Sequence, residues 1–353
     1  MSKLPLFPSL VLALLVVPPA SLLAQTPERF TVGGDRIAVY DLAGEISVVP
    51  GTGPDVVVEV TRAGADAGQL KVEVSPIRNV STLRIMFPQD RIIYPQRNWS
   101  GQSDFRVRDD GTFGGSDGDR DSRRIQVRSS GSGLEAHANL RVLVPAGKRV
   151  SVNIGVGTLD AANVNGDISL EAASANISAD HVRGSLSIDT GSGDVTVTAV
   201  DGDLSVDTGS GNVKISGANG SEITIDTGSG DVIGSDIKSA HVNVDTGSGN
   251  INLAGISTAS LSLDTGSGDV EVGLTSDTDE LSVETGSGNV TIAIPASFGS
   301  TIDLDTSSGE VDSEVSIQVT RRGRQHLSGK IGDGQGRMDI ETGSGDVTLR
   351  AVR

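Results

Sequence analysis

Asp207-Thr208-Gly209-Ser210-Gly211-Asn212-Val213 is one copy of a seven-residue phrase that recurs along the second half of the chain. Successive copies start 18, 19, 19, 19, 20, 21 and 36 residues apart. A period this short indicates a stack of structural repeats in which each repeat contacts its neighbours. The last gap is close to two periods, which suggests that an insertion has overwritten one copy. The clear copies begin at Asp189, Asp207, Asp226, Asp245, Asp264, Glu284, Asp305 and Glu341.

Each repeat has the pattern of two short strands around a turn. Leu204 and Val206 alternate with polar residues before the turn, and Val213 and Ile215 do so after it. A third apolar position follows in every copy, so each repeat offers three inward-facing positions. We therefore expect three ladders of stacked side chains. They are Ile188, Val206, Ile225, Val244, Leu263 and Val283; Val195, Val213, Val232, Ile251, Val270 and Val290; and Val164, Val182, Val200, Ala218, Ile237, Ile256 and Leu274.

These ladders favour an all-β fold, a single-stranded parallel β-helix (β-solenoid) of about 18–20 residues per coil. Equal periods let identical side chains stack at ~4.8 Å, whereas an array of antiparallel hairpins gives no reason for a third ladder. The general crossover preference favours right-handed coiling. Only 3% of the residues are aromatic, which suits thin coils filled by Val, Ile, Leu and Ala.

The first 24 residues resemble a secretory signal peptide. Lys3 gives the N-terminal region a positive charge, residues 10–17 form a short apolar core, and Ala24 is a suitable residue for cleavage by signal peptidase. The apolar run is too short to span a membrane, and the absence of Cys excludes a lipoprotein anchor and disulfide bonds. We expect an exported protein, periplasmic or secreted to the cell surface. A net charge of -18 argues against a nucleic-acid partner.

Three further regions follow the signal peptide. Apolar and polar residues alternate in residues 25–87, which predicts irregular N-terminal β strands or first coils. Residues 134–353 hold the solenoid, with a second, basic insertion at about 312–340. Between them, residues 88–133 are rich in Gly, Asp and Arg without a sustained period, so we expect disorder or a binding loop. Its candidate binding residues are Tyr94, Trp99, Phe105, Arg106, Arg108 and Phe113.

The first position of the phrase predicts a row of stacked carboxylates. Either each Asp accepts a hydrogen bond from its own turn, or calcium bridges carboxylates of adjacent coils. The calcium candidates are Asp189, Asp207, Asp226, Asp245 and Asp264.

The sixth position alternates between amide and carboxylate from copy to copy. In stacked coils, each carboxylate would then have amides above and below it, and no two charges in this row would be adjacent. The residues are Asn176, Asp194, Asn212, Asp231, Asn250, Asp269, Asn289 and Glu310.

Two enzyme classes fit poorly. Asp-Thr-Gly-Ser also occurs in pepsin-like proteases, but those need one pair of carboxylates in a cleft rather than a row. A glycan lyase or hydrolase on a β-helix needs clustered carboxylates with a basic group. The basic residues of the repeats are scattered: His181, Arg183, Lys214, Lys238 and His241.

The repeated phrase, the opening segment GGDRIAVYDLAGEISVVPG and the closing segment GKIGDGQGRMDIETGSGDVTLR together resemble the bacterial adhesin family of β-strand-repeat proteins, which is defined by a domain of unknown function. The resemblance covers roughly residues 30–353 apart from 88–133. It implies a β-solenoid and an exported or envelope location, and it brings no catalytic or binding residues.

We therefore expect a non-catalytic, adhesin-like β-solenoid that presents binding surfaces at the cell envelope, with no cofactor. Its partner would be an envelope polysaccharide or a surface protein. One alternative is a calcium-stabilised or polysaccharide-acting β-helix. Another is a structural envelope protein that self-associates through open coil ends.

Overall fold

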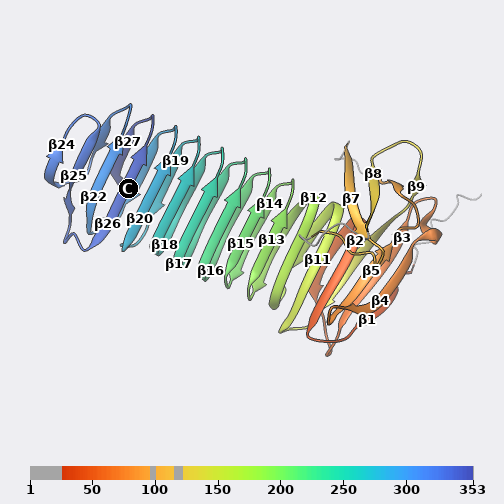
Figure 1. The fold of residues 1–353 in the computed structure, drawn as a ribbon. Helices are drawn as coiled ribbons and strands as arrows, with labels where there is room; N and C mark the ends of the chain where they lie inside the picture. Colours follow the sequence, from red (N-terminus) through yellow and green to blue (C-terminus); the bar gives the residue numbers. More distant parts are fainter. Residues whose placement is uncertain (1–25, 96–100, 115–121, 353) are drawn as a thin grey trace, which may run out of the picture.

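The structure is a computed structural model that describes residues 26–95, 101–114 and 122–352. The predicted signal peptide, residues 1–24, lies outside these ranges. The described chain is all β apart from one short 3-10 helix, η1 (Ala67–Gln69). Figure 1 shows a rod of stacked coils that broadens at its N-terminal end. No helix in the described ranges is long and apolar enough to cross a bilayer.

The rod is a β-solenoid whose strands pair in parallel with the next copy of the repeat. Ile188 lies beside Val206, and Val206 lies beside Ile225. We call the strand before the turn the first face, the strand after it the second face, and the short segment that follows the third face. The strands are β11 (Lys148–Ala162), β12 (Gly166–Arg183), β13 (Leu186–Thr190), β14 (Val195–Asp201), β15 (Leu204–Thr208), β16 (Val213–Thr227), β17 (Val232–Thr246), β18 (Ile251–Thr265), β19 (Val270–Leu274), β20 (Glu280–Thr285) and β21 (Val290–Ile294).

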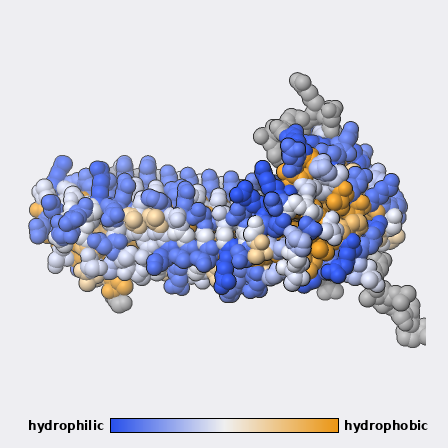
Figure 2. Space-filling model, turned by 90° about the horizontal axis from the view of Figure 1, so that it is seen from below, coloured by the Kyte–Doolittle hydropathy of each residue, from blue (hydrophilic) through white to orange (hydrophobic). Residues whose placement is uncertain are grey.

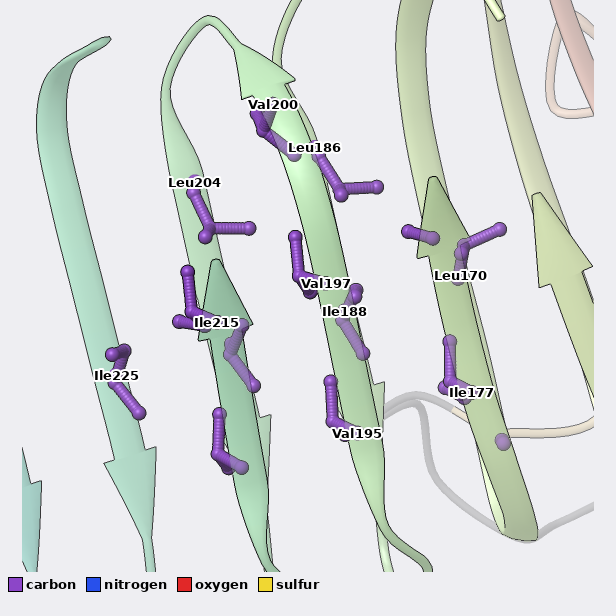
Figure 3. Close-up of a cluster of buried hydrophobic side chains, with 14 of the residues drawn as sticks. Leu170, Ile177, Leu186, Ile188, Val195, Val197, Val200, Leu204, Ile215 and Ile225 are labelled. Atoms are coloured by element: carbon purple, nitrogen blue, oxygen red, sulfur yellow. The ribbon is translucent and has the colours of Figure 1, made fainter. Parts of the chain in front are cut away.

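All three predicted ladders of apolar side chains lie in the core. Val195, Val213 and Val232 pair in register on the second face and are fully buried. Val200 and Ala218 pair on the third face and are also buried. Figure 3 shows side chains of two neighbouring faces pointing into the space between them. The core is therefore a continuous column, as the stacking of identical residues predicts.

The phrase itself forms the corner between the first and second faces. The Thr246 side chain is buried inside this corner, where its Oγ1 donates to the Gly230 carbonyl of the preceding coil at 3.3 Å. A Cβ on Gly230 would lie 2.0 Å from the carbonyl oxygen of Gly211. The phrase keeps this glycine because any side chain there would push neighbouring coils apart.

The bend between the second and third faces needs a residue with positive φ in coil after coil. Four of the six residues at this position are not glycine. The six residues, with their φ values, are Asn163 (58°), His181 (53°), Ala199 (53°), Gly217 (71°), Asp236 (54°) and Gly255 (73°).

The N-terminal end starts with a coil and then widens into flanking strands. Strand β2 (Arg36–Pro50) stacks in parallel on β11. Its first half also pairs with β5 (Val80–Met86), and β4 (Lys71–Ile77) continues that side. Its second half pairs with β10 (His137–Val144). Strand β3 (Val56–Ala63) pairs with β10 on its other side, and β1 (Glu28–Val32) pairs with β3.

A second, four-stranded sheet contains β6 (Arg91–Ile93), β7 (Gln102–Arg108), β8 (Ser122–Arg128) and β9 (Leu134–Glu135). The expectation of disorder in 88–133 is therefore wrong for the described part of this segment. Phe105 and Val107 on β7 pair with the residues of β8 and are buried. Their period-two alternation is only three residues long, and surrounding Gly, Ser and Asp residues hide it.

At the C-terminal end, the order of the coils in space differs from their order in the chain. Strands β26 (Gly336–Thr342) and β27 (Val347–Ala351) lie between β20–β21 and the last coil, β22 (Ser300–Thr306) and β23 (Val311–Ser313). In Figure 1 the chain terminus accordingly lies inward of the tip. No copy is missing in the gap of 36 residues, so that interpretation of the sequence was wrong.

The 312–340 segment covers the last coil. Strand β25 (His326–Ile331) pairs antiparallel with β22, and β24 (Gln318–Arg322) pairs with β25. We call β24 and β25 the cap hairpin. It shields the first face of the last coil, so the coil end that the self-association alternative requires is not open on this side.

Candidate functional site

A groove of about 810 Å³ lies at the N-terminal end of the rod. Its floor is the first face of the first five solenoid coils after β2. The β4–β5 hairpin and the loop of residues 108–114 form its walls. Figure 2 shows that apolar surface gathers at this end, whereas the rod is mostly polar. The floor presents a row of hydroxyl groups from Ser151, Ser169, Ser187, Ser205 and Thr224.

The hydroxyl row follows directly from strand alternation. On the first face, Leu186 and Ile188 point into the core, so Ser187 between them points out. Ser187 pairs in register with Ser205 of the next coil, and every coil repeats the arrangement. Adjacent strands lie about 4.8 Å apart, so the hydroxyls recur at that spacing along the groove.

Aromatic side chains close the N-terminal end of the groove. Tyr40 lies on β2, and its ring meets that of Phe113 edge to face with centroids 5.5 Å apart. Phe113 also packs against Phe105 at 6.1 Å. These contacts attach the 108–114 loop to the first coils, because edge-to-face aromatic pairs are favourable beyond their buried area.

Hydrogen bonds hold the 108–114 loop in one shape. The Arg108 guanidinium donates to Thr112 Oγ1 at 3.2 Å and to the Gly114 carbonyl at 2.9 Å. Asp110 Oδ1 accepts the Thr112 hydroxyl at 2.7 Å and its backbone N–H at 3.0 Å. The loop therefore offers a prearranged wall to a ligand.

The groove carries charges of both signs. Arg149 Nε lies 3.2 Å from Asp167 Oδ2, and Arg36 lies beside Arg149 in register. Five acidic and four basic side chains line the cavity, so neither sign dominates. The acidic residues are Asp110, Asp167, Glu171, Asp203 and Glu222, and the basic ones are Arg36, Arg78, Arg108 and Arg149.

Two carboxyl groups of the groove titrate differently. Burial, and then the charge of Asp189, raise the pKa of Glu171, which accepts from Ser151 and Ser169 at 3.4 Å. Burial alone would raise the pKa of Asp110 as well, but the hydrogen bonds from Thr112 lower it overall. Burial, followed by Glu171, raises the pKa of Tyr40.

A smaller cavity of about 460 Å³ shares Arg108, Phe113 and Glu171 with the groove. Phe105 and Arg106 also line it, so the structure brings four of the six predicted binding-loop residues together. The other two are not part of it. Trp99 lies outside the described residues. Tyr94 is buried against the His137 ring at 5.0 Å, and burial raises its pKa to about 12.

The sequence prediction missed Tyr40, Arg36, Arg149 and the hydroxyl row. A row of outward Ser residues was present in the repeat pattern. Nothing in the sequence showed, however, that the 108–114 loop lies over this part of the row.

The five calcium candidates do form a row, Asp189 to Asp264, exposed and in register along the first face. Burial, and then the neighbouring carboxylates, raise the pKa of Asp207 and of Asp245. Within the described residues, no three members of this row have carboxylate oxygens within 4.8 Å of one another. Their hydrogen bonds to their own turns, the simpler expectation, are not formed in the described chain either.

The sixth position, instead, joins the turns of adjacent coils. Asp231 Oδ1 accepts the backbone N–H of Asn250 at 2.8 Å and its side-chain amide at 3.1 Å. Asn250 Oδ1 in turn accepts the N–H of Asp269 at 2.9 Å. The side-chain amides of Asn212, Asn250 and Asn289 therefore each donate to one neighbouring carboxylate, not to both. The expectation that charges never meet is wrong at the last coil, where Glu310 N–H donates to Asp346 Oδ1 at 2.9 Å.

The scattered basic residues of the repeats do not assemble into a site in the described chain. His181 lies at a bend, with its Nδ1 2.9 Å from the carboxylate of the adjacent Asp180. His241 is exposed and pairs in register with Glu222 and Ser260.

No curated protein matches the chain. A solved structure described as a "putative cell adhesion protein" from Clostridium sporogenes aligns at 11% identity and a TM-score of 0.18, over 92% of this chain and 100% of that one. The family model described as Toastrack DUF4097 matches residues 137–350, more than half of the chain. The chain therefore belongs to the Toastrack DUF4097 family.

Proposed function

We propose that this chain is a non-catalytic, exported, adhesin-like β-solenoid whose groove binds an envelope polysaccharide. The observation that supports it is the groove itself. Binding sites are concave, commonly about 300–1,000 Å³, and combine apolar walls with a few polar groups. The groove is within this range, at about 810 Å³.

A glycan suits the lining better than other polymers. Hydroxyl and carboxylate groups on the floor can donate to and accept from sugar hydroxyls, and the rings of Tyr40 and Phe113 supply apolar surface. The row repeats once per coil at about 4.8 Å, so it suits a chain ligand that extends along the rod axis. The balance of charges favours a neutral polysaccharide over a strongly anionic one.

The experiment fills the floor of the groove with a bulky side chain. Ser187→Trp would place an indole in the groove and should abolish retention of the protein by neutral envelope polysaccharides in affinity electrophoresis. Ser262→Trp is the matched control, because Ser262 is equally exposed in the same row but lies outside the groove. Its retention should equal that of the unmodified chain.

Two results would contradict the proposal. Retention that survives Ser187→Trp would place binding elsewhere on the rod. Release of reducing ends from the polysaccharide during the assay would favour the enzymatic alternative, in which Glu171 and Asp110 would be the carboxyl groups to test.

A further inference from the structure

We propose that Asp303, Asp305 and His326 form a binding site for a divalent transition-metal cation such as Zn²⁺. The site would join the cap hairpin to the last coil. It lies at the opposite end of the rod from the groove and does not depend on the proposed function. In the described residues, this is the one group of three or more His, Asp or Glu side chains whose ligand atoms lie within 4.8 Å of one another.

Sheet geometry brings the three side chains together. Asp303 and Asp305 alternate with buried residues on β22, so both point outward from the same face. β25 runs antiparallel beside β22 and places His326 directly opposite Asp305. The His326 Nδ1 atom lies 2.9 Å from Asp305 Oδ1 and 3.5 Å from Asp303 Oδ1.

These separations match a metal coordination shell. Zinc bonds to His nitrogen and carboxylate oxygen are about 2.0–2.2 Å long, so ligand atoms in a tetrahedral site lie roughly 3.3–3.5 Å apart. The two nitrogen–oxygen distances bracket this range. An ion could therefore enter with side-chain rotations alone, without movement of the strands.

The other nitrogen of the imidazole is already held. His326 Nε2 lies 3.2 Å from Ser328 Oγ, which points back from the same strand. Metal-binding histidines usually donate their remaining N–H to such a partner, which orients the ring and leaves the other nitrogen free for the ion. The Ser328 contact thus directs Nδ1 at the two carboxylates.

The donor set selects the class of cation. Calcium and magnesium prefer oxygen ligands alone, whereas imidazole with carboxylate suits zinc and related transition metals. Only 21% of the His326 side chain is exposed, but about half of each Asp side chain is, at 55% and 52%. Three protein ligands would leave one position that opens to solvent and that water can occupy.

The first test is titration of the full chain with Zn²⁺, Mn²⁺ and Ca²⁺ separately, measured by calorimetry. We expect one saturable Zn²⁺ site per chain and no comparable Ca²⁺ binding. Asp305→Asn and His326→Gln should each weaken Zn²⁺ binding by more than about tenfold, because even partners outside the ligand set contribute about 10–100-fold. His181→Gln is the control, since His181 also contacts an Asp.

The second test locates the ion by hydrogen exchange. Zn²⁺ should slow amide exchange in residues 318–331 of the unmodified chain and leave the coils before β20 unchanged. Metal-free melting curves of the variants, compared with that of the unmodified chain, show whether they remain folded. If one variant does not, Asp303→Asn replaces it. The proposal fails if Zn²⁺ binding does not saturate, if folded ligand variants bind as well as the unmodified chain, or if protection appears elsewhere.

Discussion

At the bend between the second and third faces, one residue of each coil adopts positive φ, and only some coils have a glycine there. Ala199 adopts φ 53°, a conformation that is unfavourable for an L-residue with a Cβ. Gly217 adopts φ 71° at the same position of the next coil. The solenoid therefore contains strain at Ala199 that its neighbour avoids.

This difference predicts opposite effects for two single substitutions. Ala199→Gly should raise the free energy of unfolding by about 0.5–1 kcal/mol, and Gly217→Ala should lower it by a similar amount. A Cβ on Gly217 would meet nothing closer than 3.8 Å, so crowding would not contribute. Urea denaturation measures both values, and a loss of stability in Ala199→Gly would show that the bend is not strained.

The pKa of the Asp207 carboxyl group has a consequence for stability. Burial, and then Asp189 and Asp226, raise its pKa in the folded chain, so the folded state binds this proton more tightly than the unfolded state. The stability from that proton is present below the ordinary Asp pKa of about 3.9 and is lost as pH rises through the folded-state value. Asp207→Asn should therefore stabilise at pH 7, by a few tenths to about 1 kcal/mol.

Thermal unfolding at two pH values checks this expectation. Near pH 3 the advantage of Asp207→Asn should largely vanish, because the carboxyl group of the unmodified chain is then protonated. If calcium bridges the row instead, EDTA will lower the melting temperature of the unmodified chain, and Asp207→Asn will be the less stable form in calcium.

Among the elements, the solenoid strands could be predicted from the sequence and the groove could not. Identical residues at equal periods predicted which side chains of β15 and β16 stack, because each strand contacts the next copy of itself. The groove arises where Tyr40 on β2, the β4–β5 hairpin and the 108–114 loop meet over the Ser row. No period connects these segments, so only the folded chain shows that they are neighbours.

The pairing of β7 with β8 also could not be predicted from the sequence. Phe105 and Val107 are buried, while Asp104 on β7 accepts hydrogen bonds from Arg124 and Gln126 on β8. The Arg124 hydrogen bond, followed by that of Gln126, lowers the pKa of Asp104 to about 2. Arginines that suggested a ligand in the sequence therefore partly serve to pair the two strands.

The coil at the tip of the rod, β22 and β23, is not the final coil in sequence order, because β26 and β27 follow it in the chain. The gap of 36 residues between the final phrases could be explained by a lost coil or by an excursion and return, and the period alone cannot distinguish them. The structure shows the second arrangement, with Glu341 stacked between Glu284 and Asp305.

This arrangement predicts an unusual truncation. Removal of residues 336–353 would take away β26 and β27 from inside the stack and leave β22 without its parallel neighbour. We expect the last coil and the cap hairpin, residues 300–331, to lose their protection against hydrogen exchange, while strands up to β18 keep theirs. Removal of residues 352–353 alone should change little, because it breaks only the backbone hydrogen bond from Val352 to the Ile294 carbonyl and leaves β27, which ends at Ala351, intact.

One result of the truncation would contradict this expectation. If residues 300–331 stay protected, the phrase at Asp305 has docked directly on the coil of Glu284, and the chain then tolerates both orders of stacking.

The inserted final coil also has a consequence for biosynthesis. A ribosome delivers the chain from its N-terminus, so the last coil, β22 and β23, emerges before β26 and β27, on which it must rest. The rod can grow coil by coil up to Ile294, but its tip has to wait for the last residues of the chain. A product cut short between Ile294 and the end of β27 has an incomplete tip that quality-control proteases can recognise.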